Sequence, residues 1–469
     1  MYLLLFGKSG HLIFVKNNLP MKKLLLCFVL SYTSLVKGQI SIEQSTNGSI
    51  TITPKSIKGK AQNFLNSANI ALGQNSLASN INGVGNIAIG EGALYSNTFG
   101  SSNTAIGAIA LYANTSGDGN TATGFLALGE NTEGLDNTAT GAIALRHNTT
   151  GYSNTAIGNS ALSNNTIGYL NTALGTLALV GNTTGRYNTA IGANTLYFNT
   201  TGNENTAIGY FALRANTTGV SNVANGVASL YSNTTGNSNL ASGNFSLYFN
   251  TVGYSNSAYG TYSLYKNSTG YTNTAIGISS LGSNTTGYGN TAIGGSALYN
   301  NMSGNNNTAI GNLTDVSMSN ISNSTIIGAN SSVNASNKVR IGDSNITVIE
   351  GQVAWSNPSD KRLKESIVYT NRLGLDFIKK LQSVSYNYIA DKGKTRYDGF
   401  IAQDVEKTMH DLNIPFSGLK KSDDGFYSLA YSDFVIPLVN AVKEQQTEIE
   451  NLKKQVEELK SLILQTKKP

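Results

Sequence analysis

Apolar and polar positions recur with a fixed period of 17 residues through most of the chain. The consensus repeat is NTAIGxxALxxNTTGxx, and its first Asn returns at every step from Asn69 to Asn307 without an insertion. A Leu keeps its own phase from Leu77 to Leu298. Self-similarity at a fixed period indicates stacked units, each of which covers the apolar face of its neighbour.

Each repeat contains two short segments, TAIG and xALx, separated by residues that favour turns. Gly and Asn tolerate positive φ, and at this frequency they would break a helix in every unit. The pattern therefore predicts β coils stacked about 4.8 Å apart, with Asn side chains hydrogen-bonded in ladders along the stack. We expect a β-solenoid of 17-residue repeats over residues 62–313, in a mainly β protein.

The two apolar slots of the repeat differ in what they tolerate. The Leu slot never holds a polar residue, whereas the slot that holds Ile in eight repeats is less strict. Its exceptions include Thr123, Thr140, Asn225, Ser242 and Tyr259. We interpret the Leu column as the core and the Ile column as the lining of a second, inter-chain surface.

The NTAIGxxAL pattern resembles the head repeats of trimeric autotransporter adhesins, in a longer version, over about residues 62–328. It is also similar to the repeat shafts of bacterial and phage fibre proteins. These resemblances imply a trimeric β-roll or β-prism.

The character of the sequence changes after Gly328. The segments VRIG (339–342) and ITVIEGQVAW (346–355) alternate as strands do, and they predict a β collar over residues 314–358. Residues 359–469 then hold 18 Lys and Arg against 16 Asp and Glu. This charged tail differs sharply from the repeats, which indicates a separate C-terminal module.

The C-terminal module has an α+β pattern. We expect a helical stretch over 374–388, a strand over 397–406, a second strand over 426–434 and then a terminal helix.

Four ordered blocks in this tail are SDKRLK, LQSVSYNY, GFIAQDVE and YSLAYSDFVIPLVNAVKE. Together they resemble the endosialidase-type intramolecular chaperone that ends phage tail spikes and other trimeric fibres. The resemblance covers residues 359–469 and implies a chaperone and peptidase domain over 359–437. It further implies trimerisation, a catalytic Ser359–Lys364 pair and self-cleavage between Pro358 and Ser359.

The chemistry of such a pair sets conditions on the structure. A serine hydroxyl needs a base, and a lysine serves as one only if desolvation makes it neutral. A spacing of five residues places Ser359 and Lys364 on one face of neither a helix nor a strand. They can meet only through a turn or between chains. The alternative is that Ser359 and Asp360 merely cap a helix, and we expect Asp360 and Arg362 to hold local geometry.

The terminal helix contains a sustained heptad that predicts a parallel coiled coil over 438–469. Its seam comprises Val435, Leu438, Val442, Gln445, Ile449, Leu452, Val456, Leu459 and Ile463. β-branched residues alternating with Leu favour two strands by the general rule. Both family resemblances imply three, so we expect a homotrimer.

The N-terminus indicates export. From Met21 the chain reads MKKLLLCFVLSYTSLVKG, which has the charged start, apolar centre and small final residue of a signal peptide. We assign residues 1–38 to an upstream extension plus this signal, and residues 39–61 to a linker or strand. The apolar run is too short for a membrane span, which needs about 20 residues. We therefore expect an extracellular or cell-surface protein without an integral membrane anchor.

Composition excludes several functions. Residues 86–306 contain only ten charged side chains, so there is no basic stripe for nucleic acid. The triplets at Gly7 and Gly393 lack the leading Gly of a phosphate loop. His147 and His410 alone remain after the signal, so we expect no metal site and no cofactor.

The sequence thus predicts an exported trimeric fibre, adhesin-like, whose end assembles it and then acts as a single-turnover serine endopeptidase. One alternative keeps the fibre but makes the C-terminal module a permanent, uncut cap. Another makes the shaft a carbohydrate-binding adhesin with a glycan or host receptor as partner. Its binding site would be a tyrosine cluster whose phases we take as unrelated, formed by Tyr248, Tyr254, Tyr259, Tyr262 and Tyr265.

Overall fold

The computed structural model describes residues 69–353, 356–389, 391, 393–422 and 425–466, and the backbone of four N-terminal strands. The chain divides into two compact units, 1–154 and 155–469. The predicted signal peptide from Met21 lies outside the described residues. The N-terminal strands form two antiparallel pairs, β1 (Tyr2–Phe6) with β2 (Leu12–Lys16) and β3 (Ile40–Gln44) with β4 (Ile50–Pro54).

Both units contain a parallel β-solenoid with one short strand per repeat, as the period predicts. The strands of the first unit are β5 (Ile70–Leu72), β6 (Ile87–Ile89), β7 (Thr104–Ile106), β8 (Thr121–Thr123) and β9 (Thr138–Thr140). Each pairs in parallel with the next, with the same phase of the repeat opposite itself.

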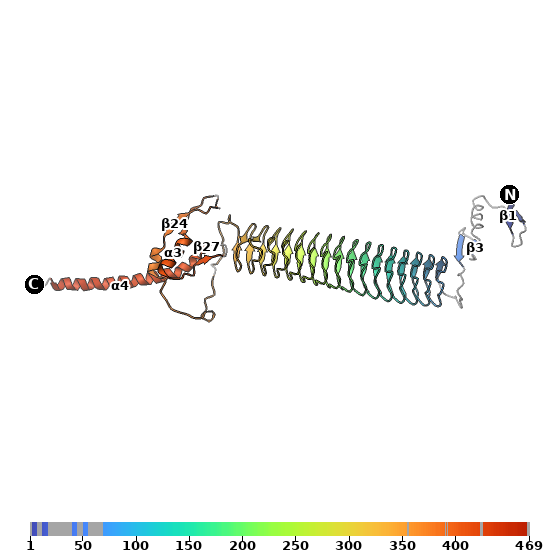
Figure 1. Cartoon of the computed structure of the whole chain (residues 1–469), viewed down its shortest axis with the longest axis horizontal. Helices are drawn as coiled ribbons and strands as arrows, with labels where there is room; N and C mark the ends of the chain where they lie inside the picture. The colour runs from blue at the N-terminus through green and yellow to red at the C-terminus, as the bar shows by residue number, and fades with distance from the viewer. Residues whose placement is uncertain are drawn as a thin grey trace. The chain divides into compact units, whose positions relative to one another are not determined.

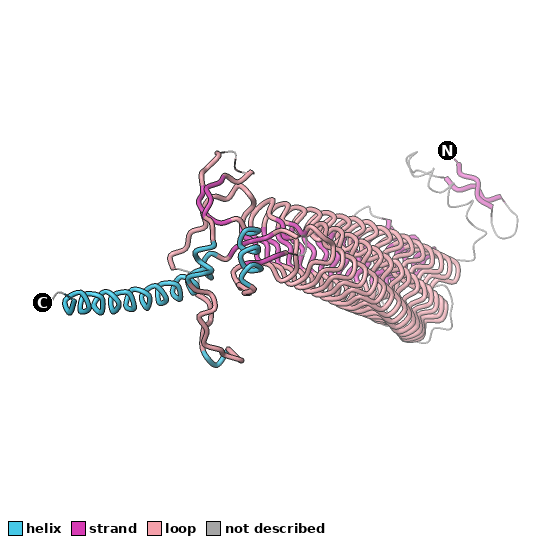
Figure 2. Tube along the Cα trace, turned by 60° about the vertical axis from the view of Figure 1, so that its left-hand side comes forward, coloured by secondary structure: helices cyan, strands magenta, loops and turns pink. Residues whose placement is uncertain are grey.

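The solenoid of the second unit has the same register and is longer. Its strands are β10 (Thr155–Ile157), β11 (Thr172–Leu174), β12 (Thr189–Ile191), β13 (Thr206–Ile208), β14 (Val223–Asn225), β15 (Leu240–Ser242), β16 (Ser257–Tyr259), β17 (Thr274–Ile276), β18 (Thr291–Ile293), β19 (Thr308–Ile310), β21 (Thr325–Ile327) and β23 (Val339–Ile341). Two further short strands, β20 (Asp315–Val316) and β22 (Ser332–Val333), pair beside them. The strands form one side of each coil, and turns form the rest (Figures 1 and 2).

The Leu column is the core of the coils. From Leu94 to Leu298 every Leu in this phase is fully buried, beside a buried Ala on the strand. The Ile column points outward instead, and Ile276 is 41% exposed. The interpretation of the Leu column is therefore confirmed, and nothing in the described chain covers the Ile column.

The predicted Asn ladders are also confirmed. Asn233 Nδ2 donates to Asn216 Oδ1 at 2.9 Å and to Gly236 O at 3.0 Å. Its own Oδ1 accepts from Asn250 Nδ2 at 2.8 Å. The first Asn of the repeat forms a second ladder, in which a backbone N–H donates to the side-chain oxygen of the coil before it. Because these amides are buried, the ladders satisfy polar groups that would otherwise be costly.

Positive φ also occurs at residues other than the Gly and Asn for which the sequence predicted it. The buried Leu of each coil is left-handed, with φ of 50° at both Leu230 and Leu247. This conformation costs about 1–2 kcal/mol for a residue with a side chain. Burial of a leucine contributes about 1.5–3 kcal/mol, so packing overrides the local preference.

Both Gly positions of the repeat lack room for a side chain. Gly226 also has a positive φ of 133°, and a Cβ there would lie 2.7 Å from Gly243 O. Gly236 is required for space, because a Cβ there would lie 2.4 Å from both Asn233 Oδ1 and Gly253 O.

Within the predicted tyrosine cluster only Tyr248 and Tyr265 share a phase, with ring centroids 5.5 Å apart, and Tyr254 begins a column outside the cluster. Tyr254, Tyr271 and Tyr288 are one repeat apart, and their rings stack at centroid distances of 4.9 and 4.8 Å with interplanar angles of 6° and 3°. Each ring therefore covers the face of the next. A sugar would need those faces, so this column favours axial stabilisation over glycan binding.

The collar is only partly as predicted. The VRIG segment forms β23, but the described residues of ITVIEGQVAW, 346–353, form no strand. A strand needs a hydrogen-bonding partner, and the described residues offer none here. Residues 354 and 355 lie outside the described part.

The C-terminal module is an α+β fold with a small hydrophobic core. Its elements are the 3₁₀ turn η2 (Lys361–Leu363), α2 (Leu375–Lys380), β24 (Ser383–Tyr386), β25 (Tyr397–Phe400), α3 (Ala402–Leu412), β26 (Leu419–Lys421), β27 (Tyr427–Leu429), the 3₁₀ turn η3 (Tyr431–Phe434) and α4 (Val435–Thr466). The core comprises Phe377, Val405, Phe416 and Phe434.

Three predicted elements of this module are corrected. The helix over 374–388 ends at Lys380, because the following SVSY alternates and pairs as β24 with β25. The strand over 397–406 ends at Phe400, and its second half begins the amphipathic helix α3. The strand over 426–434 is limited to β27, and η3 follows it.

The predicted terminal helix is confirmed as α4, but its heptad seam has no partner in the described chain. Val442 and Leu459 are about equally exposed, at 62% and 60%. Among the described helices, none combines the length and apolar character needed to cross a membrane.

Candidate functional site

The two residues predicted to be catalytic lie in contact. Lys364 Nζ donates to Ser359 Oγ at 2.7 Å within one chain. The turn η2 separates them and folds the backbone back, which is one of the two routes that the spacing allowed. The structure thus places the nucleophile and its candidate base at hydrogen-bonding distance.

Asp360 and Arg362 build the turn that brings the pair together. Asp360 Oδ1 accepts from the Arg362 backbone N–H at 2.8 Å, and Arg362 Nη2 donates to Asp360 Oδ2 at 2.7 Å. The Arg362 side chain, through these hydrogen bonds, lowers the pKa of the Asp360 carboxyl. The turn closes where the Lys364 N–H donates to Lys361 O at 3.1 Å. Asp360 therefore caps the turn, as predicted. The capping and the Ser359–Lys364 contact occur together and do not exclude each other.

The site is exposed in the single chain. Ser359 and Lys364 are both on the surface, and Leu363 between them is 71% exposed. A lysine base requires a desolvated setting. Such a setting has to come from outside this segment, because no other described residue covers it.

A family model identifies this part of the chain. The family described as the chaperone of endosialidase, a peptidase family, matches residues 359–414. The match begins at Ser359 and extends through α2, β24, β25 and α3. It supports the endosialidase-chaperone part of the resemblance. No curated protein matches the chain.

The match leaves the repeats outside it, so their likeness to adhesin heads stays a prediction. The exact roles of Ser359 and Lys364 also stay predictions. In the described part of the chain no cluster of His, Cys, Asp and Glu could hold a metal ion.

The start of α4 anchors the module through Glu444. Leu375 N–H, at the start of α2, donates to Glu444 Oε2 at 2.7 Å. Asn440 Nδ2 donates to Leu373 O at 3.1 Å. The first turns of α4 are thus part of the domain, and only the rest of the helix extends from it.

Removal of this anchor should loosen α2. In Glu444→Ala, exchange of the Leu375 amide is expected to become about tenfold faster, because a charge-assisted hydrogen bond at a helix start is lost. Hydrogen–deuterium exchange of the peptide that covers α2 measures this. Glu448→Ala, at an exposed position of the same helix, is the matched control. Equal exchange in both variants would contradict the anchoring role.

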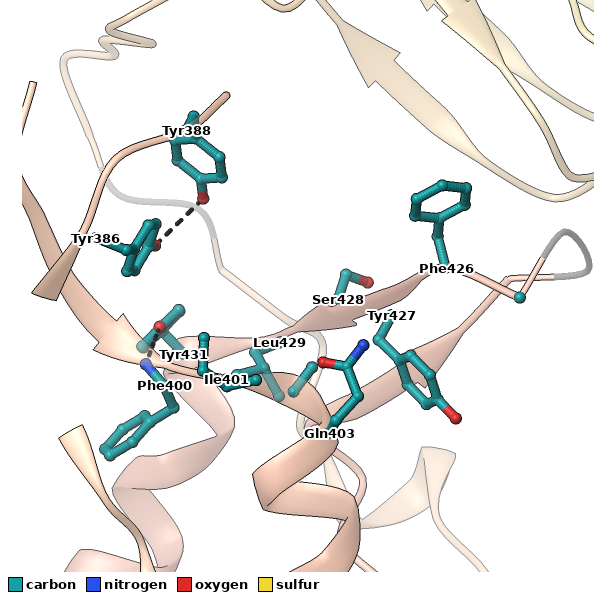
Figure 3. A pocket seen from close by; sticks show the side chains of 12 residues that line it. Tyr386, Tyr388, Phe400, Ile401, Gln403, Phe426, Tyr427, Ser428, Leu429 and Tyr431 are labelled. Carbon is teal, nitrogen blue, oxygen red and sulfur yellow. Dashed lines mark hydrogen bonds between the residues drawn. The ribbon is translucent and has the colours of Figure 1, made fainter. Parts of the chain in front are cut away.

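Sequence reasoning missed a hollow in the module. Its volume is about 710 Å³, and it lies between the two hairpins (Figure 3). Its lining comprises Tyr386, Tyr388, Phe400, Ile401, Ala402, Gln403, Gly425, Phe426, Tyr427, Ser428, Leu429 and Tyr431. None of these described lining residues is charged. The only sequence signal was the density of aromatic residues in the second and fourth blocks.

Proposed function

We propose that the chain is an exported trimeric fibre whose C-terminal domain drives assembly and then cuts the bond between Pro358 and Ser359. The observation that carries the proposal is the 2.7 Å contact between Lys364 Nζ and Ser359 Oγ, at the residue where the family match begins. Chaperone domains of this family act in trimer assembly.

The position of the nucleophile suggests how the bond breaks. Neutral Lys364 takes the proton of Ser359 Oγ, and the oxygen attacks the adjacent Pro358 carbonyl carbon. The C–N bond breaks, the Ser359 nitrogen takes the proton as an amine, and an ester joins Pro358 to Ser359 Oγ. Water then hydrolyses the ester, which leaves a Pro358 carboxylate and the restored Ser359 hydroxyl.

Assembly would supply the missing desolvation. The isoleucines of the Ile column, the apolar positions of the α4 seam and the Leu363 side chain are exposed in the single chain. Association of three chains would bury these surfaces and cover the Ser–Lys pair. Cleavage would then follow assembly, since only the covered lysine can act as a base.

A second candidate is a permanent C-terminal cap that is never cut. The exposure of both Ser359 and Lys364 favours it, because an exposed lysine is a poor base. The cap would share the trimer and the fibre but not the chemistry.

Intact mass under denaturing conditions tests the proposal. Expressed residues 39–469 are expected to yield two fragments, the second of which starts at Ser359. Ser359→Ala and Lys364→Ala are expected to give one uncut mass, and hydroxylamine should trap the ester of the wild type. An uncut wild-type trimer would refute the peptidase and leave the permanent cap.

A further inference from the structure

One apolar segment, residues 346–353, is exposed in the described part of the chain. It has no regular secondary structure, and within the described part residues 347–353 form no backbone hydrogen bond with another residue. Val348 is 63%, Ile349 62% and Val353 81% exposed. Val348, Ile349 and Val353 are β-branched, so the segment has side chains that favour a strand without the hydrogen bonds of one.

The hollow of the C-terminal module has an uncharged, aromatic-rich lining and lies beside strands that could pair with such a segment. Hairpin β24–β25 contributes Tyr386 and Phe400, and β27 contributes Ser428 and Leu429. Within the described chain each hairpin has only two strands, so each keeps an unpaired edge. Unpaired edges beside an apolar hollow are the usual setting for addition of an extended peptide as a strand.

The hollow is also suited to an uncharged occupant. Tyr386 and Tyr388 lie on one side of it and Phe426 on the other, with Ser428 between (Figure 3). The hydrogen bond between the two hydroxyls of Tyr386 and Tyr388, with burial, raises the pKa of Tyr386 to about 12. The ring therefore stays neutral at any physiological pH.

We propose that residues 346–353 of one chain occupy this hollow in a second copy of the chain as an added β-strand. The second copy is chosen because Val348, Ile349 and Val353 stay exposed in the folded single chain, although that chain also carries the hollow.

As a strand, the segment would present Ile349 and Val353 on one face, which a neutral hollow accepts, and Glu350 on the other. The hairpin edges supply backbone hydrogen bonds, except at Phe400, whose N–H donates to Tyr431 Oη at 2.9 Å. This inference rests on the trimer of the proposed function.

Such an exchange would couple assembly to the cut. The segment ends just before Pro358, so docking it in a neighbour would fix the scissile bond relative to that neighbour's module. After cleavage the occupant belongs to the shaft fragment and the hollow to the released module. The docked strand would hold the two fragments together after the bond is broken.

Single cysteines on separate chains test the exchange. Ile349→Cys in one tagged chain and Ser428→Cys in another are co-expressed in residues 39–469, with Ser359→Ala in both to prevent the cut. The one native Cys, Cys27, lies upstream of this range. A disulfide-linked dimer is expected for this pair and not for Ile349→Cys with Asp411→Cys, whose site is exposed on α3 but outside the hollow.

Two outcomes would overturn the exchange. One is a trimer without the disulfide, and the other is a disulfide that forms only when both cysteines are on the same chain. The same substitutions in chains that retain Ser359 report cleavage separately. Normal cleavage without an inter-chain disulfide would reject this inference alone, whereas loss of both trimer and cleavage in the parent chain would reject the proposed function with it.

Discussion

Lys364→Arg is expected to leave the chain uncut, with cleavage at least about 100-fold slower than in the wild type. Arginine keeps the positive charge and can donate to Ser359 Oγ as Lys364 does. It stays protonated in proteins, so it cannot take the serine proton. Intact mass over a time course after folding measures the rate.

The control is Lys361→Arg, which changes a neighbouring lysine in the same exposed turn. It should cut normally. Cleavage of Lys364→Arg at the wild-type rate would mean that position 364 supplies only a cation. The base would then have to be sought elsewhere, and the Ser–Lys contact would be structural.

Gly236→Ala is expected to disrupt the solenoid around its own coil. The new Cβ would lie 2.4 Å from Asn233 Oδ1 and 2.4 Å from Gly253 O, and 3.0 Å from Asn250 Nδ2. Because one of these atoms is backbone of the next coil, the methyl group cannot be accommodated by a side-chain rotation. Loss of the ladder bonds should cost about 2–4 kcal/mol locally, since buried amides would lose partners.

Hydrogen–deuterium exchange, peptide by peptide, is the appropriate measurement because long repeat arrays do not unfold in one step. Exchange should rise in the coils that contain Asn233 and Asn250 and stay unchanged several repeats away. Thr235→Ala, which changes the exposed residue next to Gly236, should leave exchange unchanged in both coils. Uniform protection in Gly236→Ala would show that the ladder tolerates a side chain there.

The period predicted the solenoid because the strand pairing and the Asn–Asn ladders join equivalent positions of adjacent repeats. Leu230 is buried in the Leu column, and Asn233 donates to Asn216, which holds the same position one repeat earlier. A single sequence shows which positions of the repeat are regularly apolar and hence buried. It does not show the left-handed φ of Leu230, because tertiary packing there overrides a local preference for glycine.

The C-terminal module was less predictable for a related reason. Its short elements switch between helix and strand within a few residues, as at Lys380 and Phe400, and short apolar runs fit either period. Residues 346–353 are rich in β-branched residues, but strand formation also depends on a partner, and the described part of the chain gives them none.

The spacing of Ser359 and Lys364 allowed a turn between them but did not predict one. The turn forms because the Asp360 side chain caps η2 by accepting from the Arg362 N–H.

The matching hydrogen-bond edges of the coils have an evolutionary consequence. Since each coil offers the next the same donors and acceptors, a gene that gains or loses one whole repeat changes the length of the protein without creating a new junction. Near-identical tandem units also promote unequal recombination. Natural isolates should therefore differ in repeat number in whole units, whereas insertions of partial repeats should be rare because they would place Leu, Asn and Gly out of phase with both neighbours.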